Sequence, residues 1–300
     1  MTGASLVADQ ARDVVVVGSL HYDIVVDAPD RPRKGETLAG RSWTPTFGGK
    51  GGNQAVAARR QGVPTAMVGA VGNDAFGMAL LADLDRAKVD RSVVAIIEGA
   101  GSGMSVAIFD DEGDYGAVIV SGANLAISAG QAGDGLLRAA KVLVLQNEIP
   151  ELVNEAVARR GRPHGVVTIL NAAPARMFET RLPELVDILV VNAIEAEMLG
   201  GGKVESLADA AAAAGLLSAR FKAAIVTAGG DGVAFSDRSG QRIELPGIPV
   251  VVASTHGAGD AFVGTLAARL AMGASPGDAL HAANLEAAQW VALPQNLRSL

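Results

Sequence analysis

The residues best suited to chemistry form a glycine-rich turn near the end of the 300-residue chain, at 255–260 (Thr-His-Gly-Ala-Gly-Asp). An apolar run over 248–253 precedes it and an apolar-periodic segment follows it, which predicts an extended segment, a turn and a helix. Small residues at a helix start leave backbone N–H groups open to an anion. A carboxylate beside them, here Asp260, suits removal of a hydroxyl proton while the amides stabilise a transferring phosphoryl group. The simpler alternative is that Asp260 only complements the helix dipole.

A second glycine-rich stretch, Gly48-Gly49-Lys50-Gly51-Gly52-Asn53, lies in the first fifth of the chain and leads into another helical pattern. Its glycines permit a ligand to approach the backbone closely at a helix start. The stretch is not a Walker P-loop, because Gly51 stands where that motif requires Ser or Thr. Asn53 offers both hydrogen-bond donors and acceptors, as a sugar hydroxyl requires. We therefore favour a binding function over a flexible turn.

Short apolar runs alternate with helical patterns through most of the chain. This alternation predicts a mostly parallel, doubly wound α/β sheet with helices on both faces. The runs expected as strands are 14–17, 65–71, 142–146, 166–170, 188–191 and 223–226. Two β-rich stretches, about 22–46 and 93–120, interrupt the pattern and predict a small discontinuous sheet that covers a site as a lid. An edge extension or a subunit interface is the alternative for these stretches, and a lid is compatible with an interface.

Polar residues follow several of the predicted strands. Open α/β sheets bind their ligands at the carboxyl ends of the strands, so these side chains are expected to line one crevice. They are Asp23, Glu148, Asn192, Glu195, Thr227 and Asp260. Two of them have plain alternatives: Glu148 could cap the helix that follows it, and Glu195 could be a solvated helix residue.

Composition excludes several classes of function. A net charge of -7 gives no electrostatic footprint for nucleic acid or an anionic membrane. No apolar run is long enough to span a bilayer, and residues 1–12 lack the pattern of a secretory signal. The absence of cysteine excludes disulfides and thiolate chemistry. We expect a cytoplasmic globular protein.

Several other chemistries lack their motifs. The segment 18–23 does not supply the Gly-x-Gly-x-x-Gly of a dinucleotide-binding fold. The four histidines are too scattered for a dedicated zinc site, and no serine stands in a nucleophile elbow. His256 adjoins the glycine-rich turn, where we expect an exposed or dipole-lowered imidazole rather than a base.

The two glycine-rich stretches together closely resemble the signatures of the ribokinase-like (phosphofructokinase-B) sugar kinases. The agreement covers nearly the whole chain in the same order, through 17–23, 121–124, 146–148, 192–195 and 227–229. The resemblance implies one kinase domain over 1–300 with a β lid that often forms a homodimer interface. It also implies transfer of the ATP γ-phosphoryl group to a hydroxymethyl of a pentose or related small sugar, with ribose first.

The resemblance also implies roles for individual residues. Asp260 would be the general base, and Gly257, Ala258 and Gly259 would form the anion hole. The sugar-binding residues would be His21, Asp23, Gly49, Lys50, Asn53 and Glu148. The residues near the nucleotide would be Asn192, Thr227, Gly229, Gly232 and Asn284. Glu195 would bind Mg²⁺, partly through water, because Mg²⁺ gives up its waters reluctantly.

Three departures from the family pattern carry predictions. His21 replaces an asparagine, which alters the hydrogen-bond geometry against one sugar hydroxyl and puts D-ribose itself in question. Ser254 replaces an aspartate that helps to bind an activating K⁺, and the C-terminal loop at 293–296 also differs. We therefore predict weak or absent activation by K⁺.

Other functions remain as alternatives to a pentose kinase. Within the family, the chain could be a nucleoside kinase or act on another sugar. An aromatic content of 4% argues against the base-stacking slot of a nucleoside kinase. Outside the class, it could be a sugar-binding regulator without turnover, although Asp260 and the anion hole are intact. A nicotinamide-dependent oxidoreductase would need a cofactor motif that the first strand turn lacks.

Overall fold

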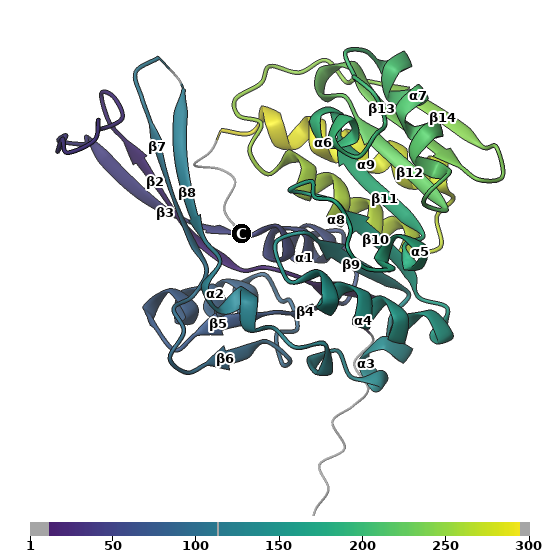
Figure 1. Ribbon diagram of the computed structural model, residues 1–300, viewed down its shortest axis with the longest axis horizontal. Coiled ribbons are helices and arrows are strands. Elements are labelled where there is room, and N and C mark those ends of the chain that lie inside the picture. Colours follow the sequence, from purple (N-terminus) through teal and green to yellow (C-terminus); the bar gives the residue numbers. More distant parts are fainter. Residues whose placement is uncertain (1–11, 113, 295–300) are drawn as a thin grey trace, which may run out of the picture.

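The computed structural model describes residues 12–112 and 114–294 and contains an eight-stranded sheet with the order β14-β13-β12-β11-β10-β9-β1-β4 (Figure 1). The parallel strands are β1 (Val14–Val17), β4 (Thr65–Val68), β9 (Val142–Gln146), β10 (Val167–Asn171), β11 (Ile188–Asn192) and β12 (Ala223–Thr227). β13 (Gly232–Asp237) and β14 (Arg242–Pro246) extend one edge in antiparallel fashion. The predicted doubly wound α/β fold is confirmed.

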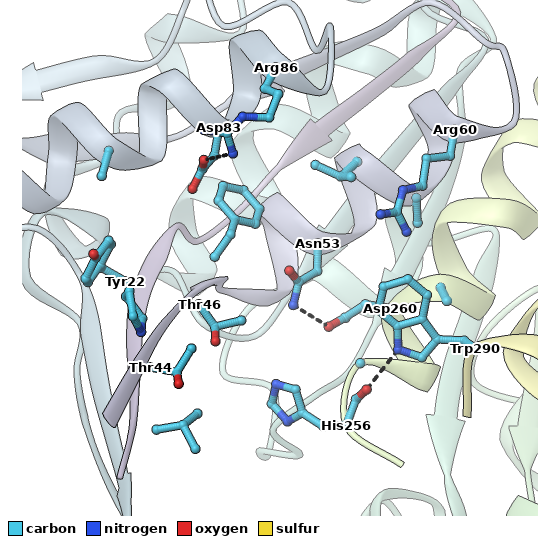
Figure 2. Close-up of a pocket in the computed structure, with 18 of the residues that line it drawn as sticks. Tyr22, Thr44, Thr46, Asn53, Arg60, Asp83, Arg86, His256, Asp260 and Trp290 are labelled. Atoms are coloured by element: carbon cyan, nitrogen blue, oxygen red, sulfur yellow. Dashed lines mark hydrogen bonds and ion pairs between the residues drawn. The ribbon is translucent and has the colours of Figure 1, made fainter. Parts of the chain in front are cut away.

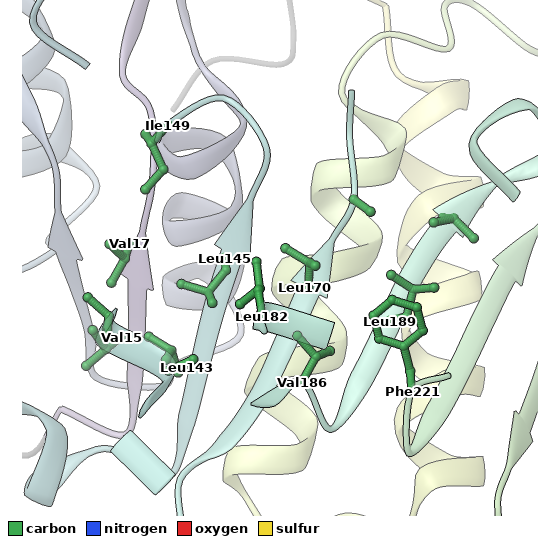
Figure 3. Close-up of a cluster of buried hydrophobic side chains, with 14 of the residues drawn as sticks. Val15, Val17, Leu143, Leu145, Ile149, Leu170, Leu182, Val186, Leu189 and Phe221 are labelled. Carbon is green, nitrogen blue, oxygen red and sulfur yellow. The ribbon is translucent and has the colours of Figure 1, made fainter. Parts of the chain in front are cut away.

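Helices cover both faces of this sheet because its strands are apolar on both sides. One face is covered by α1 (Lys50–Arg60), α2 (Ala75–Arg86), α8 (Ala258–Ala271) and α9 (Pro276–Ala292). The other face is covered by α3 (Asp134–Ala139), α4 (Glu151–Gly161), α5 (Leu182–Leu185), α6 (Ala193–Met198) and α7 (Leu207–Ser218). Successive residues of β1 alternate between the two cores: Val14 and Val16 belong to one, and Val15 and Val17 lie in the other beside Leu143 (Figure 3).

The lid is a four-stranded sheet that projects from the main body (Figure 1). Its order is β3 (Ser42–Gly48), β2 (His21–Asp27), β7 (Met104–Phe109) and β8 (Tyr115–Val120). Two segments distant in sequence therefore build one sheet, as predicted. The inclusion of residues 93–97 was wrong, because β6 (Ala95–Ile97) pairs with β5 (Ala70–Gly72) in a separate two-stranded sheet.

One further expectation about a strand was also wrong. The strand expected over 65–71 divides at Gly69, whose carbonyl accepts hydrogen bonds from Ala95 N and Gln131 Nε2 instead of continuing the main sheet. The apolar run at 248–253 was predicted as an extended segment; it belongs to no helix or strand, and Ala253 N donates to Val291 O on α9. Short 3-10 helices complete the fold at η1 (Gly122–Ala126), η2 (Ala129–Gln131), η3 (Arg162–His164) and η4 (Gly229–Asp231).

Some expectations concern parts of the chain outside these elements. Two expectations fall on residues that the structure does not describe. One is the lack of a signal sequence, which concerns residues 1–11, and the other is the altered C-terminal loop, part of which lies in 295–300. Within the described part, no helix combines the length and apolar character needed to cross a bilayer.

Candidate active site

The two glycine-rich stretches meet where α1 and α8 pack side by side. A Cβ added to Gly264 on α8 would lie 2.5 Å from Ala57 Cβ and 2.6 Å from Gln54 O on α1, so only glycine permits this approach. The close packing brings Asp260, one turn before Gly264, next to the first turns of α1. Asn53 Nδ2 donates to Asp260 Oδ2 at 3.1 Å, and Gln54 Nε2 donates to Asp260 Oδ1 at 2.8 Å.

Asp260 is a buried carboxylate, 8% exposed. Burial raises its pKa above the ordinary aspartate value, and the nearby Glu148 carboxylate adds to this. The positive charge of Lys50 and the amide donors of Gln54 and Asn53 act in the opposite direction. The site thus holds a carboxylate that is more basic than a solvated aspartate, as general-base catalysis near neutral pH requires.

Lys50 supplies a positive charge beside Asp260. Burial lowers its pKa, but the carboxylates of Asp260, Glu148 and Glu195 outweigh burial, so the pKa is raised overall and the ammonium group stays charged. Glu148 Oε2 accepts from the Lys50 backbone N at 2.9 Å and from the Ser19 hydroxyl. Glu148 therefore binds the start of α1 and does not cap the following helix, α4, which has no side-chain cap.

The start of α8 has the form expected of an anion hole. Its N-cap, Gly257, has φ of 77°, which glycine adopts without strain, and no side chain caps the helix. The Ala258 N–H donates to Thr255 O at 3.3 Å within the turn, so this amide is partly committed. The turn is also held from outside, because the Trp290 indole N–H donates to His256 O at 2.9 Å.

A cavity of about 750 Å³ opens beside Asp260, between the lid edge and helices α1, α2, α8 and α9 (Figure 2). Thr44 and Thr46 line it from the lid, and Asn53 and Asp260 line it from the main body. His256 is exposed and lines the same space, as predicted. Of the residues predicted to bind the sugar, only Asn53 lines this cavity; the others are His21, Asp23, Gly49, Lys50 and Glu148.

Two of these residues lie on β2 at the base of the lid. Asp23 Oδ1 accepts from Ser105 Oγ at 2.5 Å. His21 is 3% exposed, and its Nε2 has no hydrogen-bond partner among the described residues. Gly103 lies against the ring, since a Cβ there would be 2.5 Å from His21 Cδ2. Buried polar atoms are normally paired, so His21 Nε2 is an open hydrogen-bonding position.

The residues predicted on the nucleotide side are arranged around α6 and β12. Asn192 and Thr227 are register neighbours at the ends of β11 and β12. Asn192 Oδ1 accepts from Glu195 N and Glu195 Oε2 accepts from Asn192 N, both at 2.9 Å, which is a capping box. Burial raises the pKa of Glu195, and Asp260 adds to this while Lys50 opposes it. Glu195 is therefore electrostatically part of the Asp260 site.

The remaining residues predicted to lie near the nucleotide make contacts within the fold itself. Gly229 begins η4, and Gly232, with φ of 123°, starts β13 against Leu245 O. Asn284 Nδ2 donates to Pro246 O at 3.1 Å and so ties α9 to β14. Among the described residues, no three His, Asp or Glu side chains gather as a ready metal cluster.

Sequence reasoning missed four residues that support the site. Gln54, Gln146 and Asn171 form a buried amide chain behind Asp260, and Trp290 holds the turn before α8. Gln54 stands directly after Asn53 in the motif, which was an available signal. Gln146 also lies in a matched stretch, 146–148, but the partners of Gln146, Asn171 and Trp290 are distant in sequence and could not be read locally.

Known proteins resemble this chain over nearly its full length. The model of the pfkB family carbohydrate kinases matches residues 11–296. A ribokinase from Bacillus subtilis is 36% identical over 275 residues, covering 91% of this chain and 90% of that protein. A deoxyribokinase from Salmonella typhi is 31% identical over 260 residues, covering 85% of this chain and 84% of that protein. The structure of Arabidopsis thaliana ribokinase complexed with ribose and ATP has a TM-score of 0.87 at 30% identity, covering 95% of this chain and 94% of that one.

Proposed function

Because the chain belongs to the pfkB family of carbohydrate kinases and is an ATP-dependent carbohydrate kinase, we propose that it phosphorylates a hydroxymethyl group of D-ribose or a closely related pentose. The observation that carries the proposal is the hydrogen bond of 3.1 Å between Asn53 of the first glycine-rich stretch and Asp260 of the second. It puts a side chain suited to a sugar hydroxyl beside a buried carboxylate and an uncapped helix start. The ribokinase and deoxyribokinase relatives support a pentose.

In the proposed reaction, Asp260 accepts the proton of the sugar hydroxyl as its oxygen bonds to the γ-phosphorus. The bond from the γ-phosphorus to the bridging oxygen breaks, and ADP leaves with that electron pair. The turn formed by Gly257, Ala258 and Gly259 stabilises the charge on the transferring group. Lys50 remains positive beside Asp260 and favours the ionised base that the reaction needs.

The sugar is held by residues from the lid base and from α1. His21 Nε2 is buried without a partner, so a sugar hydroxyl would satisfy it. Asp23 and Glu148 offer carboxylate acceptors, and Lys50 offers a donor. Gly49, whose φ is 83°, leaves space where any Cβ would lie 2.7 Å from His21 N. An imidazole at position 21 presents one ring nitrogen to this hydroxyl, so we expect substrate preference to depend on it.

The nucleotide lies along Asn192, Thr227, Gly229 and Gly232, with Asn284 at the adenine side. Glu195 fits a divalent cation, because it is a half-buried oxygen donor whose charged form burial disfavours. Mg²⁺ held there, partly through water, would neutralise charge on the phosphates.

The test is a phosphorylation panel of D-ribose, 2-deoxy-D-ribose, other pentoses and nucleosides with ATP and Mg²⁺, run on the parent and on Asp260→Asn. We expect a pentose to have the highest kcat/KM, and Asp260→Asn to lower kcat by about 10²-fold or more. Burial raises the pKa of Asp260, so parent kcat should fall as pH drops through that raised value, at higher pH than for an ordinary aspartate.

The matched control is Asp83→Asn, because Asp83 lines the far end of the same cavity and pairs with Arg86 (Figure 2). It should leave kcat within about twofold, since a surface ion pair contributes little. A nucleoside as the best substrate would favour the nucleoside kinase alternative. Turnover by Asp260→Asn within tenfold of the parent would contradict the general-base role, and no turnover by the parent on any sugar would favour a regulator.

We also propose a homodimer formed through the lid. Strand register places Ile24, Val106 and Val118 side by side on the face opposite Asp23, and Val118 is 68% exposed. A four-stranded sheet with an exposed apolar face is suited to a partner sheet. Light scattering after gel filtration should give a dimer for the parent and a monomer for Val118→Asp. Leu152→Asp, at a residue 70% exposed on α4, is the control and should remain dimeric. A monomeric parent at micromolar concentration would exclude this interface.

A further inference from the structure

A chain of buried side-chain amides lies behind Asp260, on the side away from the cavity. Gln54 Nε2 donates to Asp260 Oδ1 at 2.8 Å and to Asn171 Oδ1 at 3.0 Å. Gln54 Oε1 accepts from Gln146 Nε2 at 2.8 Å. Gln54 and Gln146 are fully buried and Asn171 is 8% exposed. Each polar atom of the Gln54 amide is therefore engaged where water has no access.

A hydrogen bond to the main sheet determines how the side-chain amides of this group are oriented. Asn171 Nδ2 donates to Val190 O on β11 at 3.2 Å, so Asn171 must turn its Oδ1 toward Gln54. Gln146 presents its NH₂ group to Gln54 from the other side. A flipped Gln54 amide would set its oxygen against the oxygens of both Asp260 and Asn171. Only one amide orientation satisfies all three neighbours, and it presents a donor to Asp260.

Two glycines make room for this arrangement. A Cβ on Gly18 would lie 1.8 Å from Gln146 Oε1, and a Cβ on Gly264 would lie 2.6 Å from Gln54 O. The first leaves space for the Gln146 side chain beneath α1, and the second lets α8 approach α1. The close packing that brings the two glycine-rich stretches together therefore also brings Gln54 to Asp260.

We propose that Gln54 is a positioning residue for phosphoryl transfer, which holds Asp260 Oδ1 so that Oδ2 faces the cavity and the substrate hydroxyl. Asn171 and Gln146 act through Gln54 by fixing its amide. This inference rests on the proposed role of Asp260 as general base. Asn53 donates to Asp260 Oδ2 and lines the cavity, so it contacts substrate in that proposal. Gln54 does not line the cavity and therefore does not contact substrate.

The first experiment compares Gln54→Leu with the parent, using the sugar that gives the highest turnover. Loss of the amide should lower kcat by about 10- to 100-fold while KM for sugar and ATP changes by less than about twofold, because ground-state contacts remain. Asn154→Ala is the matched control: Asn154 is equally buried, and its amide donates to the backbone at Gln146 O. It should lose stability and keep its kcat per folded molecule.

The second experiment is a double-mutant cycle of Gln54→Leu with Asn171→Ala. Asn171→Ala alone should lower kcat several-fold, and it should have no further effect on kcat in the Gln54→Leu background, because it acts through Gln54. Independent, additive effects would overturn the relay. If Gln54→Leu does not fold, Asn171→Ala and Gln146→Leu carry the test, and unchanged kcat in both would overturn the proposal.

Asp260→Asn measured in parallel separates the two proposals. If Asp260→Asn abolishes turnover while Gln54→Leu keeps kcat within about twofold of the parent, only the positioning role of Gln54 is wrong. If Asp260→Asn remains active, the general-base role itself is wrong, and any effect of Gln54→Leu has another origin.

Discussion

Helices α6 and α8 each carry an acidic residue at their third position, Glu195 and Asp260, and both carboxylates raise the pKa of Lys50. The hydrogen bonds of the two acids nevertheless differ. In α6, Glu195 turns back to accept from the N-cap residue Asn192, whose side chain accepts from Glu195 in return. In α8 the N-cap is Gly257, which has no side chain to exchange, and Asp260 bonds to α1 instead. One helix start is satisfied by its own residues, and the other remains available to a ligand.

The difference shows that the N-cap residue decides what an acid at the third position does. An asparagine at the N-cap favours the reciprocal capping box and keeps the carboxylate on its own helix. A glycine in the left-handed conformation offers no such partner, so the first-turn amides have no side-chain cap, although the Ala258 N–H is partly committed to Thr255 O. In the proposed function, the two helix starts therefore have different tasks, with reaction chemistry at α8 and supporting charge at α6.

Among changes to these two helix starts that leave Asp260 in place, the largest expected effect comes from giving α8 a side chain at its N-cap. In Gly257→Ala, the left-handed φ of 77° should cost about 1–2 kcal/mol of stability. The new Cβ would lie 3.1 Å from Trp290 Nε1 and displace the turn. We expect kcat to fall about 10- to 100-fold, approaching the loss of one oxyanion-hole donor. Steady-state kinetics and urea unfolding measure the two effects separately.

Gly165→Ala is the matched control for this variant. Gly165 has φ of 74°, and a Cβ there would meet nothing within 4 Å. It should show a similar loss of stability with unchanged kcat. If both variants lost stability and neither lost kcat, the α8 turn would have no special role in turnover.

The motifs and the main sheet were predictable because their signals are local. Positive-φ glycines, the apolar run of β1 and the Asp260 turn can be read within a few residues. Partner choice could not be read in this way: Glu148 bonds to α1 although it precedes α4, and Asn171 meets Gln54 only after the sheet has formed. The three-residue strand β6 likewise carries no information about which sheet it joins.

A smaller effect is expected from removing the charge of the α6 acid while keeping its cap. Glu195→Gln retains the capping box, since glutamine also serves at this position, so the free energy of unfolding should change by only a few tenths of a kcal/mol. KM for ATP with Mg²⁺ should rise about three- to tenfold, because the site loses a carboxylate that favours the cation. Glu197→Gln, on the exposed face of α6, should change neither quantity. An unchanged KM in Glu195→Gln would limit this residue to capping.

The smallest effect is expected from K⁺, and it concerns what holds the turn before α8. The family resemblance implies an activating cation there, and we predict that this turn does not depend on one. The Ser254 hydroxyl accepts from His256 N at 3.2 Å, and the His256 carbonyl accepts the Trp290 indole N–H at 2.9 Å. Arg60 lies over the Trp290 ring at 5.2 Å, which adds a positive charge beside the indole.

These hydrogen bonds hold the turn before α8, as the capping box holds the start of α6, so we predict that a cation adds little to it. Replacing Na⁺ by K⁺ at constant ionic strength should change kcat by less than about twofold. An ion that does not bind one conformation of the turn more tightly than another cannot shift the equilibrium between those conformations. Trp290→Phe removes the indole donor and keeps an aromatic ring under Arg60, so it should lower kcat in both salts. Strong stimulation of the parent by K⁺ over Na⁺ would show that the Trp290 bond does not replace the cation.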